Sequence, residues 1–144
     1  MWILLALGAS VFWGLTYVLY EEAYKSISVA TLLALSSFVI FVVTLLMAFF
    51  GDNLRADITS ILSSKRLIIL VVSGIVTLLV AELFISYSIV AKNATLAGLI
   101  EISYPIFIAL ASYFIFKNNQ LTWSAGVGGA LIFIGIAIIY YFNR

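Results

Sequence analysis

The sequence contains no cysteine and no histidine in its 144 residues. These absences exclude disulfide bonds, thiolate nucleophiles and imidazole bases, and they remove the usual protein ligands of zinc and haem. We therefore expect no metal site, no cofactor and no catalytic centre. Charge is scarce as well, because only 9% of the residues are charged, whereas a soluble domain has about 25%. The formal net charge of +1 gives no indication of a nucleic-acid partner.

Hydrophobic residues make up 65% of the chain. A soluble fold of this length has too little interior to hide them, so the surrounding solvent must be a lipid bilayer. In lipid every backbone polar group has to be satisfied within the chain, and long apolar runs therefore form helices. The sequence predicts an all-α integral membrane protein.

A membrane span needs about 20 mostly apolar residues. Five such runs are present, at residues 2–20, 28–50, 67–91, 94–116 and 123–142. They predict a single membrane domain over residues 1–144, built as a bundle of five transmembrane helices. The first run lacks the basic segment of a signal peptide, so we expect it to be a span. After the second span, the apolar spacing predicts a short interfacial helix capped near Asp57.

The basic residues give little indication of orientation. They divide four to three between the two sides of the membrane: Arg55, Lys65, Arg66 and Lys117 against Lys25, Lys92 and Arg144. One interpretation is a single topology with a slight preference for a cytoplasmic N-terminus. The other is dual topology, in which the same chain inserts both ways and pairs antiparallel.

Two carboxylates lie inside predicted spans, Glu82 in the third and Glu101 in the fourth. An acid at the bilayer centre costs roughly 2.5–3.5 kcal/mol on insertion scales, and such residues are functional candidates by default. Both lie about 12–15 Å from the turn that joins the two spans, at similar depth. Two acids at one depth predict a shared proton or a bound cation. The alternative is a structural role, with a protonated glutamate bonded to a serine or tyrosine of a neighbouring helix.

Pro105 is the single proline, and it follows Glu101 by four residues. Proline has no N–H, so the Glu101 carbonyl loses its helical donor, and we expect a kinked helix with a free carbonyl beside the carboxyl. Such a position suits coordination of a cation or a hydroxyl group, with Tyr104 next to it. An ordinary kink filled by a neighbouring side chain is the alternative.

One face of the first span carries polar and aromatic residues at helical spacing: Ser10, Trp13, Gly14, Tyr17 and Glu21. This face can line a cavity and hold an organic cation by cation–π attraction, and Trp13 and Tyr17 are therefore candidate site residues. It can equally be a close-packed helix contact. Other aromatic residues near span ends are typical of the interfacial belt: Trp2, Tyr20, Tyr24, Trp123 and residues 140–142.

Small residues recur along the fifth span, among them Gly126, Gly129 and Gly135. Small side chains let helix backbones approach closely in a membrane. We therefore expect this helix to pack, either against other helices of its own chain or against a second copy.

The order and spacing of the five helices resemble an EamA-type domain of the drug/metabolite transporter superfamily, over nearly the whole chain. The pattern is a Trp-Gly pair in the first helix, a late proline, a Leu-Thr turn and a glycine-rich last helix. The matching residues are Trp13, Gly14, Ala97, Pro105, Phe107, Leu121, Thr122, Gly129, Leu131, Ile132 and Gly135. One departure is that residues 118–120 are Asn-Asn-Gln where such domains carry Gly-Glu before the turn.

The resemblance implies a multi-pass secondary transporter of the cell inner (plasma) membrane that moves small organic metabolites or drugs. Full-length relatives have ten spans in two inverted five-helix halves, and this chain resembles one half. An antiparallel second copy is then the expected partner, with proton coupling as a further expectation. The alternative is a non-transporting membrane subunit or assembly partner. An enzyme is not expected, because a serine nucleophile would have no lysine at similar depth to activate it.

Overall fold

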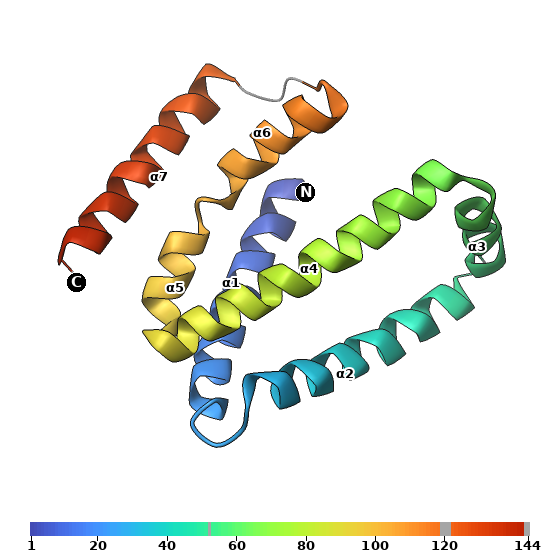
Figure 1. The fold of residues 1–144 in the computed structure, drawn as a ribbon, viewed down its shortest axis with the longest axis horizontal. Coiled ribbons are helices and arrows are strands. Elements are labelled where there is room, and N and C mark those ends of the chain that lie inside the picture. Colours follow the sequence, from blue (N-terminus) through green and yellow to red (C-terminus); the bar gives the residue numbers. More distant parts are fainter. Residues whose placement is uncertain (52, 119–121, 143–144) are drawn as a thin grey trace. The chain divides into compact units, whose positions relative to one another are not determined.

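The computed structural model describes residues 1–51, 53–118 and 122–142, and this part of the chain is helical, without strands (Figure 1). The helices are α1 (Trp2–Ala23), α2 (Val29–Phe50), α3 (Leu54–Ser63), α4 (Lys65–Ala91), α5 (Ala94–Glu101), α6 (Tyr104–Phe116) and α7 (Trp123–Phe142). Within the described ranges, five segments are long and apolar enough to cross a membrane: α1, α2, α4, α5 together with α6, and α7. The predicted fold class is confirmed. Leu121 and Arg144, used in the sequence analysis, lie outside the described residues.

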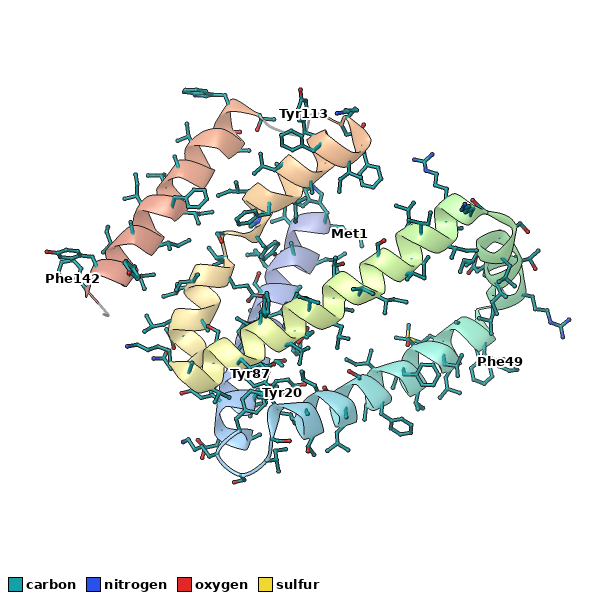
Figure 2. All side chains as sticks on the ribbon, viewed as in Figure 1. Met1, Tyr20, Phe49, Tyr87, Tyr113 and Phe142 are labelled. Atoms are coloured by element: carbon teal, nitrogen blue, oxygen red, sulfur yellow. The ribbon has the colours of Figure 1, made fainter. Side chains whose placement is uncertain are left out.

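Large apolar side chains project outward from the helices, as Phe49 near the end of α2 illustrates (Figure 2). Phe49 is 67% exposed and Phe38, on the same helix, is 65% exposed. Exposure of this kind would be strongly unfavourable in water, where soluble proteins keep apolar patches small. In a bilayer the same side chains would contact lipid tails, so their exposure is favourable there.

Two of the helices extend past the predicted spans. The first span was expected to end at residue 20, and α1 continues to Ala23; the third was expected to begin at residue 67, and α4 begins at Lys65. Both extensions add charged residues, among them Glu21 and Arg66. Hydropathy marks the hydrocarbon core, whereas the hydrogen-bonded helix continues into the interface, where charged heads reach water.

The interfacial helix is present as α3, but its predicted cap is wrong. The residue before the helix is Asn53, which makes no side-chain capping hydrogen bond, and Asp57 lies within the first turn. An acidic side chain there still interacts favourably with the positive end of the helix dipole. The sequence signal near Asp57 therefore identified the helix and misplaced its start.

The chain forms two compact units, which we describe separately. Unit 1 comprises Met1–Val18 and Ser88–Arg144, and unit 2 comprises Leu19–Tyr87. In unit 2, α3 connects α2 to α4 (Figure 1). In unit 1, α5 and α7 approach each other, and Gly129 of α7 faces Ile106 of α6 so closely that an added Cβ would lie 3.2 Å from the isoleucine Cγ1.

The fourth span is interrupted inside unit 1. It was expected to be one kinked helix, and it is two helices, α5 and α6, separated by Ile102 and Ser103 (Figure 1). The Ser103 N–H donates to the Ile100 carbonyl at 3.2 Å, which closes the end of α5 with a tighter turn. Pro105 lies in the first turn of α6, where its fixed φ and missing N–H are tolerated. The interruption therefore falls directly after Glu101.

Candidate functional site

The central contact of unit 1 joins α1 to the end of α5. The Tyr17 hydroxyl donates a hydrogen bond to Oε2 of Glu101 at 2.5 Å, between residues 84 positions apart in the chain. Both side chains are half-buried. Tyr17 and Glu101 were each predicted as site residues, and the structure brings them together. A hydrogen bond to a carboxylate is roughly twice as strong as one between neutral groups.

Glu101 holds its carboxyl at an unusual position, since it is the last residue of α5. The residue four positions later, Pro105, has no N–H to offer the Glu101 carbonyl. A carboxyl and a main-chain carbonyl without that helical donor therefore belong to the same residue. Oxygen atoms grouped in this way can bind a proton, a small cation or a hydroxyl group.

The Tyr17 ring lies against the backbone of α5. A Cβ added at Gly98 would be 3.4 Å from Cδ2 of Tyr17, which is an ordinary van der Waals contact. Gly98 precedes Glu101 by three residues and so lies on the same side of α5. The Tyr17 ring therefore passes over Gly98 to reach the carboxyl, at a distance that would also accommodate a methyl group. Sequence reasoning did not identify Gly98, and its spacing from Glu101 is the signal that was available.

Of two other predicted site residues, Trp13 contacts the Tyr17–Glu101 pair and, in the described part of the chain, Tyr104 does not. The Trp13 ring packs on the Tyr17 ring, with centroids 5.7 Å apart and planes tilted by 53°. Tyr104 is 56% exposed, and within the described residues no hydrogen bond or ring contact joins it to Tyr17 or Glu101. The aromatic face of α1 thus extends the site towards Trp13, while a role for Tyr104 stays a prediction.

Glu82 belongs to α4 in unit 2 and is half-buried. Because Glu101 belongs to unit 1, the expected match in depth between the two carboxyls stays a prediction. The helix around Glu82 differs from that around Glu101, since α4 continues without a break from Lys65 to Ala91.

Unit 2 contains a hydrogen bond that sequence reasoning missed. The Tyr24 hydroxyl donates to Oγ of Ser86 at 2.8 Å, and Ser86 is only 1% exposed. Figure 2 labels Tyr20, one turn before Tyr24, and Tyr87, which directly follows Ser86. Burial raises the pKa of the Tyr24 hydroxyl above its ordinary value of 10.0, and the charges of Tyr20 and Glu82 add to the rise, while the hydrogen bond with Ser86 opposes it.

Helix α7 was predicted to pack through its glycines. One of these glycines contacts α6, and the other two have open space beside them. Gly129 is buried against Ile106, and beside it α6 and α7 enclose an apolar hollow of about 220 Å³. A Cβ added at Gly126 or Gly135 would meet nothing within 4 Å in the described part of the chain. Contact within the chain therefore accounts for Gly129 and leaves the other two glycines available for another surface.

Comparison with known proteins decides the class of this molecule. The model of the EamA-like transporter family matches residues 1–141. The chain belongs to this family. The resemblance stated from the sequence is thereby confirmed, and with it a multi-pass membrane protein of the drug/metabolite transporter type. The EamA family is a family of transporters, not of enzymes. No curated protein and no solved structure matches the chain.

Proposed function

We propose that this EamA-family chain is a secondary transporter, an exporter or exchanger, that moves small organic metabolites or drugs and couples their movement to protons. The observation that carries the proposal is the hydrogen bond between Tyr17 and Glu101 at the interruption of the fourth span. The family match supports the class of activity, and the carboxyl supplies a group that can change charge within the membrane.

The pair has two hydrogen-bonded states. When Glu101 is ionised, its oxygens accept the Tyr17 hydroxyl. When it is protonated, it gains an O–H that can donate to the phenol oxygen, which both donates and accepts. A proton thus changes the direction of the bond and removes a charge from the membrane interior. Because α5 ends at this residue, the chain can adjust there without breaking a continuous helix.

The same proposal places two copies antiparallel in the inner (plasma) membrane, each supplying five spans. Inverted halves surround the substrate site in many transporters. The open positions at Gly126 and Gly135 on α7 support a contact with a second copy, because small residues let membrane helices approach closely. The nearly balanced basic residues are compatible with insertion in both orientations.

Proton coupling is tested with Glu101→Gln in proteoliposomes. Glutamine keeps the size of the side chain and can still accept from Tyr17, but it cannot take up a proton. A panel of radiolabelled small organic solutes is offered with and without an imposed pH gradient. We expect gradient-driven uptake in the wild type and its loss in Glu101→Gln. Glu22→Gln is the matched control, since Glu22 is exposed and pairs with Lys25 near the end of α1. Uptake in Glu101→Gln that still follows the gradient would contradict the coupling role.

The antiparallel arrangement is tested by fusing a topology reporter to each terminus in turn. Reporters active on both sides of the membrane from either terminus support the pair. A single clean orientation contradicts it. A folded, reconstituted chain that moves no solute of the panel favours the non-transporting subunit instead.

A further inference from the structure

A second phenol, just after the end of α1 and separate from Tyr17, belongs to unit 2. Tyr24 directly follows the last residue of α1, at the interfacial end of that span. Its hydroxyl donates at 2.8 Å to Ser86, which lies inside the membrane-spanning α4 and is almost fully buried. A polar contact thus begins at the membrane surface and ends on a buried hydroxyl group.

Ser86 follows Glu82 by four residues, so both lie on one side of α4, with Cβ atoms about 5–6 Å apart. Glu82 is also close enough to Tyr24 to act on it electrostatically. A serine hydroxyl has two lone pairs and one hydrogen atom. Tyr24 donates to the Ser86 oxygen, and the Ser86 hydroxyl has one hydrogen of its own to donate.

We infer that Tyr24 and Ser86 form the route by which protons pass between the membrane surface and Glu82. The inference rests on the proposed function, because a proton delivered to Glu82 serves transport only if solute movement is coupled to protons. It assigns Tyr24 and Ser86 as positioning and relay residues. This role differs from the one predicted from the sequence, in which Tyr24 belongs only to the interfacial aromatic belt.

The transfer balances as one concerted step without an ionised hydroxyl group. A hydronium ion at the surface gives a proton to the Tyr24 oxygen and becomes water, while the phenolic proton moves to the Ser86 oxygen and the hydroxyl proton of Ser86 moves to the Glu82 carboxylate. Each hydroxyl forms one O–H bond and breaks one, and one proton is transferred in total from hydronium to Glu82. The return path reverses this step.

The surroundings of Tyr24 favour this mode of transfer. Burial is the largest effect on the Tyr24 hydroxyl and raises its pKa, and the charges of Tyr20 and Glu82 add smaller contributions. The phenol therefore keeps its proton at physiological pH and remains a donor to Ser86. The next residue, Lys25, is exposed and paired with Glu22.

The route is tested by infrared spectroscopy of the full-length protein in lipid, without any solute. The protonated Glu82 carboxyl is identified as the C=O band that disappears in Glu82→Gln. After mixing with D₂O, the shift of this band reports how fast the Glu82 proton exchanges. We expect Tyr24→Phe, which removes one oxygen and keeps the ring, to slow the exchange by about tenfold or more. Ser86→Ala should slow it similarly, and the double variant should be no slower than either single one, because both lie on one path.

Tyr20→Phe is the matched control, because it removes a phenol oxygen one turn away, from a ring that packs on Tyr24 at 5.9 Å. It should leave the exchange rate unchanged. Unchanged exchange in Tyr24→Phe, equal slowing in Tyr20→Phe, or a Glu82 band that never exchanges would each overturn the route. A wild type that takes up solute without regard to a pH gradient would instead contradict proton coupling, and this result is distinguishable because the exchange measurement needs no transport.

Discussion

The two intramembrane glutamates differ at the residue four positions further along the chain. For Glu101 in unit 1 that residue is Pro105, and for Glu82 in unit 2 it is Ser86. Around Glu101 the span is interrupted and the carboxyl accepts from Tyr17. Around Glu82 the helix continues, and the serine accepts from Tyr24.

This difference separates two kinds of polar contact in a membrane. A carboxyl can gain or lose charge, and a position between two helices gives the backbone freedom to respond. A serine hydroxyl keeps its charge fixed and, in an unbroken helix, can only pass a hydrogen bond along. By this account a proton reverses the hydrogen bond between Tyr17 and Glu101 in unit 1, whereas in unit 2 the hydroxyls of Tyr24 and Ser86 pass a proton to Glu82.

The largest effect on stability is expected when the residue four positions after Glu82 is changed to proline, the residue found four positions after Glu101. Ser86→Pro removes an interior N–H of α4 together with the hydroxyl that Tyr24 contacts. We expect a loss of about 3 kcal/mol or more in the free energy of unfolding, measured by denaturant titration in detergent. Ser86→Ala is the control, because it removes the hydroxyl and keeps the N–H. Equal stability of the two variants would show that α4 already tolerates a break.

The converse change, Pro105→Ala, tests whether proline causes the interruption of the fourth span. Alanine supplies an N–H for the Glu101 carbonyl, so α5 and α6 should join. The gain in stability should be below the ~3 kcal/mol penalty of an interior proline, because Pro105 lies in the first turn of α6. Amides of residues 102–106 should exchange more slowly with solvent, and gradient-driven uptake should fall. If their exchange rates are unchanged, packing and not proline interrupts the span.

Double-mutant cycles compare the two phenol contacts directly. For Tyr17→Phe with Glu101→Ala we expect a coupling energy near the upper end for membrane helices, about 1.7 kcal/mol, because the acceptor can be charged. For Tyr24→Phe with Ser86→Ala we expect about 0.6 kcal/mol, the average for such bonds. Unfolding titrations of the single and double variants give both values. A larger coupling energy for Tyr24 with Ser86 than for Tyr17 with Glu101 would contradict the proposed difference between the two contacts.

The smallest expected effect is that of Gly98→Ala. The added methyl group makes an ordinary contact with the Tyr17 ring, so stability should change by less than about 1 kcal/mol. Gly14→Ala is the matched control on α1, because a Cβ there meets nothing within 4 Å in the described segments. Unfolding midpoints of the two variants isolate the ring contact. A severe loss of stability in Gly98→Ala alone would mean that the Tyr17 ring cannot move away from the added methyl group.

Most of the fold could be predicted because hydropathy and length act locally. Lipid requires each apolar run to satisfy its own backbone, so span number and helical class follow directly. Helix ends could not be predicted as well, because α1 and α4 continue to Ala23 and Lys65 through charged residues, where apolar character no longer indicates the helix. The fourth span is fully interrupted at Ile102 and Ser103, whereas only a kink was expected. The proline in the sequence shows which hydrogen-bond donor is missing, but it does not show which conformation the neighbouring backbone adopts.

The candidate site was predictable where a single helix face carried the signal. Helical spacing placed Trp13 and Tyr17 together, and the cost of an intramembrane acid singled out Glu101. The bond between Tyr24 and Ser86 depends on which helices meet, and that information is not local. Serine is also common in membrane helices, so Ser86 has no sequence signal beyond its spacing from Glu82.

The central claim, which belongs to the proposed function, is that Glu101 carries the proton whose movement is coupled to that of the solute. Its most direct test uses weakly buffered proteoliposomes with a pH-sensitive dye inside and a transported solute added outside. The account predicts a change of internal pH with solute movement in the wild type and in Glu22→Gln, and no such change in Glu101→Gln. Proton movement of wild-type size in Glu101→Gln would contradict it.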